Sequence, residues 1–225
     1  MRINLRAGRL TAGLVASALV GLATIAGAQP SERSDRLPVR SLLELRNDGL
    51  VRQHWDLSCG AAAVATVLTF QLGNATTERE AALGMLQMTD AKLVRSRLGF
   101  SLLDLKKFAA ARGFVATGYG NLELPELLAM SPAITPLRLG GFGHFVIVRG
   151  LKNDRLLIAD PSFGNRAMPV REFLGAWTSR VGFTIKRGND PNPPNRMAWS
   201  PEFAIAPSGA AVRAADAAIR RVGGR

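Results

Sequence analysis

The chain has 225 residues, of which 47% are hydrophobic and 23 are glycine. This length and apolar content suit one domain of ordinary size with extensions, and they exclude a chain too polar to bury a core. The formal net charge is +12. Such a charge can indicate nucleic acid or an anionic surface as partner. The arginines are scattered, however, and no stretch interleaves them with aromatic residues, which favours a solvated basic surface and no nucleic-acid partner.

The first 28 residues differ in composition from the rest. Residues 1–9 carry three arginines and no acid, and residues 10–26 are uncharged and largely apolar. A small-x-small cleavage signal ends at Ala28. This order predicts a secretory signal peptide over residues 1–28, and therefore a periplasmic or secreted protein. An uncleaved membrane anchor is the alternative, although the apolar run is short for a span.

The single cysteine, Cys59, lies between a polar lead-in and an Ala-rich run from Gly60 to Phe70. The run predicts a buried helix, with Ser58 as its candidate N-cap. Unpaired N–H groups and the macrodipole at a helix start lower the pKa of a thiol and favour the nucleophilic thiolate. Because one cysteine cannot form an internal disulfide, Cys59 is an inert core thiol, an intermolecular partner or a reactive thiol. Its position favours the reactive thiol.

Helical signals dominate the first half of the chain after the signal segment. Residues 29–46 are polar and predict a linker or an arm, whose leucines near the end attach it to the domain. Helical spacing or capping residues predict three further helices, over residues 77–88, 101–112 and 122–130. Residues 89–99, between the first two of these, predict a basic loop with at most a short helical piece.

The second half predicts strands. Apolar or alternating runs occur at residues 114–119, 133–139, 144–150, 155–160 and 181–186, with a short helix at 170–177. The turn at residues 152–154 makes the third and fourth runs an antiparallel hairpin, and residues 161–165 predict a loop. Helices followed by a mostly antiparallel sheet predict an α+β domain over residues 47–187. Residues 188–225 predict an irregular basic tail.

The predicted hairpin brings a histidine close to a carboxylate. His144 follows the glycine-rich turn at residues 140–143, and Asp160 ends the partner strand. Both lie nearly the same distance from the turn, so they face each other or are diagonal neighbours. A carboxylate beside a histidine orients the imidazole as a general base. Alone, Asp160-Pro161 would predict only the turn that ends a strand, and the other histidine, His54, predicts a structural or surface residue.

Gln53 is a candidate oxyanion donor. It lies six residues before Cys59. A side-chain amide in that place can donate to an oxyanion together with a backbone N–H at the helix start. A surface glutamine is the alternative.

Other chemistry has little support in the sequence. One cysteine and two histidines give no zinc-ligand spacing. The sequence contains no H-E-x-x-H, G-x-S-x-G or G-x-x-x-x-G-K-[ST] motif, and the glycines at residues 140–143 complete no dinucleotide fingerprint. We therefore expect no metal, no cofactor and no ATP.

The order and spacing of four residues resemble a known family. The motifs Gln-x5-Cys-Gly-Ala, His-Phe-Val and Asp-Pro resemble those of the bacteriocin-processing, double-glycine cysteine peptidases, which have a papain-like fold. The resemblance covers about residues 50–187. It implies Cys59 as nucleophile, His144 as base and then acid, Asp160 as the residue that orients His144, and Gln53 as oxyanion donor.

Within that family the chain is most similar to stand-alone, exported members encoded with functional-amyloid secretion systems. Three stretches carry this similarity: RQHWDLSCGAAA, GFSLLDLKKFAAARGF and ADPSFGNR. One departure is Ser58, which precedes the cysteine where the family commonly has Asp, while Asp56 lies two positions earlier. A second is that the transporter-linked members are fused to membrane spans and an ATPase, for which this sequence has no motif.

The resemblance implies an exported cysteine endopeptidase that cleaves a protein or peptide exported by a partner secretion system. Two alternatives stay open. The first alternative is a non-hydrolytic chaperone or docking module for a secreted, amyloid-type substrate. The second is an enzyme that transfers the acyl group to an amine instead of water.

Overall fold

The computed structural model describes residues 41–188, 190 and 193–198. The predicted signal peptide, residues 29–40 of the predicted arm and most of the predicted tail lie outside the described residues. Within the described part of the chain, no helix combines the length and apolarity needed to cross a bilayer.

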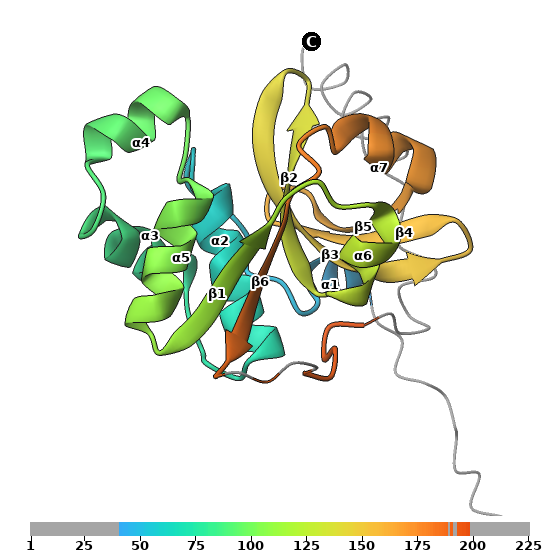
Figure 1. Cartoon of the computed structure of the whole chain (residues 1–225), viewed down its shortest axis with the longest axis horizontal. Coiled ribbons are helices and arrows are strands. Elements are labelled where there is room, and N and C mark those ends of the chain that lie inside the picture. Colours follow the sequence, from blue (N-terminus) through green and yellow to red (C-terminus); the bar gives the residue numbers. More distant parts are fainter. Residues whose placement is uncertain (1–40, 189, 191–192, 199–225) are drawn as a thin grey trace, which may run out of the picture. The chain divides into compact units, whose positions relative to one another are not determined.

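Helices come first in the chain and most strands follow, as the sequence predicts (Figure 1). The elements are α1 (Leu42–Asn47), α2 (Cys59–Thr66), the π-helix η1 (Val67–Gln71), α3 (Glu78–Leu86), α4 (Ala91–Arg97), α5 (Leu102–Ala111), β1 (Phe114–Tyr119), α6 (Leu124–Ala129), β2 (Ala133–Leu139), β3 (Phe142–Lys152), β4 (Arg155–Asp160), β5 (Gly164–Pro169), α7 (Val170–Ala176) and β6 (Gly182–Arg187). The fold is α+β, which confirms the predicted class.

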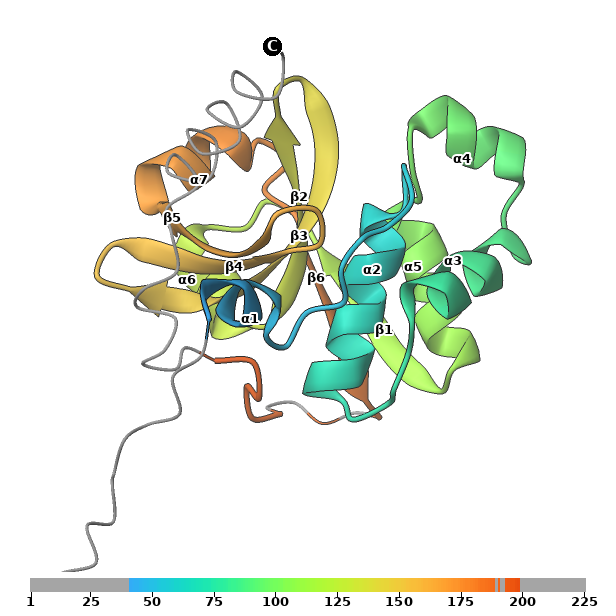
Figure 2. The ribbon, with the colours of Figure 1, turned by 180° about the vertical axis from the view of Figure 1, so that it is seen from behind.

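The strands form one antiparallel sheet in the order β1-β6-β2-β3-β4-β5. Strands β2 to β5 follow one another as neighbours. The last strand, β6, lies between β1 and β2, and it meets β2 only where Phe183 pairs with Ile134. Figure 2 shows α2, α3 and α5 grouped beside β1, away from α6 and α7.

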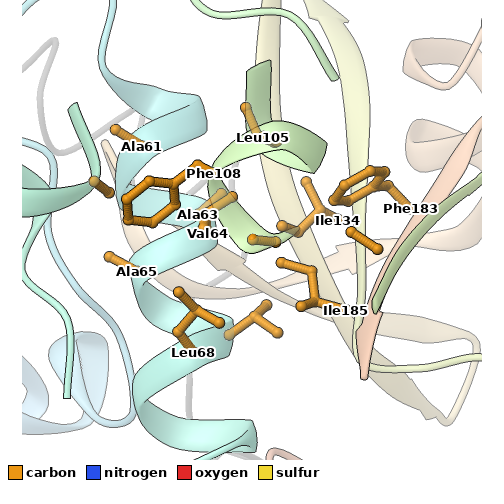
Figure 3. Packing of buried hydrophobic residues seen from close by; sticks show 14 of the residues in the cluster. Ala61, Ala63, Val64, Ala65, Leu68, Leu105, Phe108, Ile134, Phe183 and Ile185 are labelled. Carbon is orange, nitrogen blue, oxygen red and sulfur yellow. The ribbon is translucent and has the colours of Figure 1, made fainter. Parts of the chain in front are cut away.

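The sheet separates two apolar clusters because alternate residues of a strand point to opposite faces. On β3, Ile147 joins the cluster that contains α2 and α5, whereas Val146 and Val148 join the cluster that contains α6 and α7. Figure 3 shows the first cluster, where α2 side chains face those of α5 and of the strands. Every residue of α2 is buried, as its apolar composition predicts.

Small residues let α2 approach the sheet closely. A Cβ atom on Gly60 would lie 3.1 Å from Cδ1 of Leu105 and 3.2 Å from Cδ2 of Phe145. Both contacts are shorter than ordinary van der Waals separation, so α2 lies wedged between α5 and β3. The start of α2, with Cys59, is thereby held beside the strand that carries His144.

Two short helices, α1 and α4, form within the predicted arm and within the predicted basic loop, where a short helical piece was left open. Ser41 and Glu44 make a capping box that opens α1, and of the three leucines expected to attach the arm only Leu45 is buried. Asp90 caps α4 within the predicted basic loop. In both places the cap supplies the start of the helix. Each helix has one buried apolar residue, a periodic signal too weak to predict α1 at all or to give the bounds of α4.

Strand β5 was missed altogether. A loop was predicted over residues 161–165, and no strand was predicted between residues 160 and 170, whereas β5 pairs along its whole length with β4. Its buried residues include Asn165 and Arg166, so it lacks the apolar alternation that marks a strand. Asn165 donates to the carbonyl oxygens of Leu45 and Asp48, which explains how a polar side chain is buried there.

The described part of the predicted tail packs on the domain. Met197 is buried, and its carbonyl oxygen accepts a 2.6 Å hydrogen bond from Nε of Arg149. Gln71, at the end of the π-helix, donates to the carbonyl oxygen of Pro194 at 2.7 Å. Residues 193–198 are thus irregular but attached to the domain.

Candidate active site

Cys59 lies at the first position of α2, and no side chain caps this helix. The expected N-cap, Ser58, does not cap it, because its backbone lies at φ −100° and ψ 11° and its hydroxyl points elsewhere. The hydroxyl donates to Oε1 of Glu78 at 2.5 Å and to the carbonyl oxygen of Trp55 at 2.7 Å. The N–H groups of the first turn are therefore left for the thiol and for a bound anion.

A buried carboxylate orders the lead-in to Cys59. Glu78 accepts hydrogen bonds from the backbone N–H groups of His54 and Trp55 at 2.9 and 3.2 Å, and from the hydroxyl of Ser58. Burial raises the pKa of Glu78, but these donors outweigh it and bring the pKa below its usual value. His54 Nδ1 also contacts Glu78, while the ring is largely exposed. In the sequence Glu78 is only a residue of the helix predicted over residues 77–88, because nothing local relates it to residues 20 positions earlier.

His144 and Asp160 are hydrogen-bonded. Nε2 of the imidazole lies 2.7 Å from Oδ1 of the carboxylate. The hairpin between β3 and β4 turns at Asn153 and Asp154, both with positive φ, close to the predicted turn. The two side chains are diagonal neighbours, which is one of the two arrangements that the sequence predicted.

A β-bulge at Arg149 decides which face of β4 carries Asp160. The pairing of β3 with β4 shifts by one residue at this point. Continued past the bulge, the register places Asp160 beside Val146, two residues from His144 and on the same face. Without the extra residue Asp160 would lie beside Ile147, and its side chain would point to the opposite face.

The carboxylate of Asp160 is fully buried and surrounded by donors. Oδ1 also accepts from the backbone N–H groups of Ser162 and Phe163 at 3.0 and 3.1 Å, and Oδ2 lies 2.9 Å from a guanidinium nitrogen of Arg166. Burial raises the pKa of Asp160, but the bond and charge of His144, followed by the charge of Arg166, bring it below its usual value.

Cys59 and His144 interact directly. Because Nε2 of the ring contacts Asp160, Nδ1 is the nitrogen left for the sulfur. Burial raises the pKa of the Cys59 thiol, but hydrogen bonds with His144 and the backbone of Phe145, and the charge of His144, bring it below its usual value. Burial lowers the pKa of His144, but Asp160 and Cys59 together raise it to about 9. These opposite shifts favour a thiolate–imidazolium pair at neutral pH.

Gln53 lies against the loop that follows Asp160. Its backbone N–H donates to the carbonyl oxygen of Pro161 at 2.9 Å, and its side-chain oxygen accepts from the hydroxyl of Ser162 at 2.8 Å. Its Nε2 donates to the carbonyl oxygen of Trp55 at 2.7 Å, which leaves one N–H of the amide available. The amide is thus held at both ends.

An apolar groove of about 320 Å³ lies beside the lead-in to Cys59. Trp55 and Ser58 of the lead-in line one side of it, and side chains of α3 and α4, such as Leu83 and Val94, line the rest. The groove does not include Cys59 or His144. No group of three or more histidine, cysteine or acidic side chains within the described residues is placed to hold a metal ion.

Residues 48–189 match the model of the family described as Peptidase C39. The chain belongs to this family. It is 35% identical over 153 residues to a protein named "Probable functional amyloid protease FapD" from Pseudomonas aeruginosa, covering 68% of this chain and 67% of the relative. The identity to the protein of the same name from Pseudomonas fluorescens is 35% over 152 residues, with the same coverage.

Solved structures of similar fold include a double glycine motif protease from an AMS/PCAT transporter, in complex with the leader peptide. Its TM-score is 0.50 at 26% identity, covering 61% of this chain and 90% of that one. The peptidase domain of Streptococcus ComA has a TM-score of 0.50 at 23% identity, covering 61% and 96%. The family assignment makes this protein a cysteine peptidase, and the papain-like fold that the resemblance implied is confirmed.

Proposed function

We propose that this peptidase cleaves a protein exported by a partner secretion system, through a Cys59–His144–Asp160 triad. The observation that carries the proposal is the continuous contact from the Cys59 thiol to His144 and from His144 to Asp160. These three side chains come from α2, β3 and β4, and the closeness of their functional groups matches what thiol acyl transfer requires.

The reaction begins when the thiolate of Cys59 attacks the carbonyl carbon of the scissile bond. The carbonyl oxygen becomes an oxyanion, and the available N–H of Gln53 together with the uncapped N–H groups of α2 stabilises it. The imidazolium of His144 gives its proton to the leaving amine, which departs as the thioester forms. His144 then takes a proton from water, the resulting hydroxide displaces the thiolate, and the peptide acid is released.

Asp160 keeps Nε2 of His144 engaged throughout, so that Nδ1 stays turned towards the sulfur. It also stabilises the imidazolium, because its carboxylate is buried and its own pKa is lowered. No metal or cofactor enters any of these steps.

The proposed substrate is an exported polypeptide of a functional-amyloid system, and the proposed place of action is outside the cytoplasm. Three features support this: the composition of residues 1–28, the names of the FapD relatives, and the apolar groove beside the lead-in, which suits apolar side chains of a polypeptide. The groove lies next to Ser58, so a bound segment would lead towards Cys59.

The test uses the purified protein and a candidate substrate, an exported polypeptide of a functional-amyloid system, with product masses measured by mass spectrometry. We expect one defined cut by the wild-type protein and none by Cys59→Ala. Cleavage at the wild-type rate by Cys59→Ala would exclude the proposed mechanism. A parallel reaction with an added amine distinguishes hydrolysis, which yields a free carboxylate, from acyl transfer, which yields an amide.

A binding-only docking module is the second candidate. It requires a groove but no reactive thiol, whereas a peptidase requires both. Alkylation of Cys59 by iodoacetamide separates them, and the reaction is specific because the chain contains one cysteine. Labelling at pH 6 no faster than that of the amino acid cysteine would favour the docking module.

A further inference from the structure

Arg166 is a buried arginine in β5 to which the triad assigns no role. It belongs to the motif ADPSFGNR, and it is only 3% exposed. A buried guanidinium costs free energy unless a partner offsets its charge. That partner is Asp160, whose Oδ2 lies 2.9 Å from NH2 of Arg166.

The sheet places Arg166 and His144 symmetrically around the carboxylate. On the β5 side, Asp160 pairs with Gly164, so Arg166 is its diagonal neighbour. On the β3 side, His144 is also its diagonal neighbour. One oxygen of the carboxylate therefore contacts the imidazole, and the other contacts the guanidinium.

The contact between Arg166 and Asp160 is an ion pair rather than a well-aligned hydrogen bond. Nη2 of Arg166 lies 2.9 Å from Oδ2 of Asp160. Within the described residues, neither atom has a partner that meets the geometry of a hydrogen bond. The ring of Phe163 lies under the guanidinium, with its centroid 5.7 Å from Cζ, and edge-on to the His144 ring at 6.4 Å. Charge and stacking hold Arg166 in place.

We propose that Arg166 is a positioning residue for the peptidase reaction: its guanidinium holds Oδ2 of Asp160, so that Oδ1 stays on Nε2 of His144 and Nδ1 stays turned to Cys59. This inference rests on the proposed function. Arg166 does not touch the reacting atoms and acts through Asp160.

Removing the guanidinium of Arg166 should raise two pKa values, that of Asp160 and that of the Cys59 thiol. A positive charge stabilises the ionised form of an acid beside it, so its loss raises the pKa of Asp160, and the carboxylate then holds His144 less firmly. A less firmly held imidazolium stabilises the Cys59 thiolate less, so the pKa of the thiol rises as well. The charged groups that face Asp160 are His144 from β3, Arg166 from β5 and, as a weaker charge interaction, Arg52 from the lead-in. An Arg166 variant keeps Arg52 and His144. Any change in the charge around Asp160 therefore comes from the loss of Arg166.

The experiment measures the rate of Cys59 alkylation by iodoacetamide from pH 4 to pH 10, together with the melting temperature. We expect Arg166→Met to move the midpoint of the rate profile up by about one pH unit, which lowers the rate at pH 6 about tenfold. Arg166→Lys keeps the charge, so its midpoint should stay close to that of the wild-type protein. The control is Arg187→Met, which removes a positive charge from β6, where the guanidinium donates to the carbonyl oxygen of Leu72 and stacks on Phe114; it should leave the midpoint unchanged.

A second arm tests whether Arg166 acts through Asp160. In an Asp160→Asn background, Arg166→Met should shift the midpoint no further, because the carboxylate on which the cation acts is gone. Should Arg166→Met fail to fold, Arg166→Leu replaces it, since an apolar side chain fills part of the space and cannot bind Oδ2 of Asp160.

Two results would overturn the inference. In one, the midpoint of the neutral variant coincides with that of the wild-type protein while the melting temperature falls. In the other, Arg166→Met shifts the midpoint equally in both backgrounds. Failure of the proposed function looks different, because the wild-type protein itself would then label no faster than the amino acid cysteine.

Discussion

The hydroxyl of Ser162 donates a 2.8 Å hydrogen bond to the side-chain oxygen of Gln53, which lies 109 residues earlier in the chain. The backbone N–H of Ser162 donates to Asp160 at the same time. One residue thus joins the proposed oxyanion donor to Asp160, the acid proposed to orient His144. The loop after β4 couples two parts of the site that come from opposite ends of the domain.

Replacing Ser162 by alanine should lower kcat about tenfold, the equivalent of one side-chain hydrogen bond, with little change in KM. The amide of Gln53 would then be held only through Nε2 and could turn away from the oxyanion. Ser162→Thr keeps the hydroxyl and serves as the control. Steady-state rates on a fluorogenic peptide that spans the cut found by mass spectrometry give the measurement, and equal kcat values for Ser162→Ala and the wild-type protein would contradict the coupling.

Replacing Asp160 by asparagine should lower turnover by about 10² to 10⁴, the range of a general acid–base contribution. The side chain keeps its shape but loses the charge that stabilises the His144 imidazolium. The same peptide assay measures turnover, and circular dichroism confirms the fold. Unaltered turnover would show that Asp160 does not orient the base.

The pH dependence of Cys59 alkylation should show that His144 lowers the pKa of the thiol. In the wild-type protein the pKa of Cys59 lies below its usual value, so labelling should stay fast below pH 8. His144→Gln removes the largest cause that lowers this pKa, and burial, which raises it, then dominates. The midpoint should therefore move to higher pH, above that of the wild-type protein. A midpoint unmoved by His144→Gln would mean that the ring does not stabilise the thiolate.

Replacing Glu78 by glutamine should cost about 1–3 kcal/mol of unfolding free energy and lower the labelling rate of Cys59. The amide offers one acceptor oxygen where the buried carboxylate now accepts from several donors of the lead-in. Chemical denaturation measures the first effect and iodoacetamide the second. The matched control is Glu80→Gln in the same helix, where an exposed glutamine retains the capping box and should change neither quantity.

Replacing Gly164 by alanine should destabilise the protein by about 1–3 kcal/mol. Its φ is +86°, and a Cβ atom would lie 2.8 Å from the carbonyl oxygen of Arg46 and 2.9 Å from a guanidinium nitrogen of Arg52. Gly140→Ala is the control, since φ is +58° there but nothing lies within 4 Å of the added atom. If thermal denaturation gives the same loss for both variants, the contact with α1 and the lead-in is not what requires glycine.

The local sequence was sufficient to predict most elements and the main candidates. A capping box at Thr77 and Glu80, and another at Ser101 and Asp104, start α3 and α5 where they were predicted. Both depend on residues three positions apart, so they are visible without the fold. Strand β4 was likewise predicted from its apolar run and ends at Asp160, as expected.

Long-range polar contacts could not be predicted in the same way. Glu78, Ser162 and Arg166 are ordinary polar residues in the sequence, and they become parts of the site only because α3 and β5 lie against the lead-in and β4. The bulge at Arg149 carries no local signal either, yet it places Asp160 on the face of His144. A shift of one residue reverses the face of a side chain, and only strand pairing fixes that shift.

By itself, the sequence determined that a lone thiol, Cys59, stands at the start of a small-residue helix, and that His144 and Asp160 stand at one end of a hairpin. Neighbouring residues settle these features, through capping, apolar spacing and turn chemistry. Only the tertiary structure decided which oxygen of Asp160 contacts His144, and that Arg166 holds the other. Those contacts depend on the register of three strands, and register is set by packing across the whole sheet.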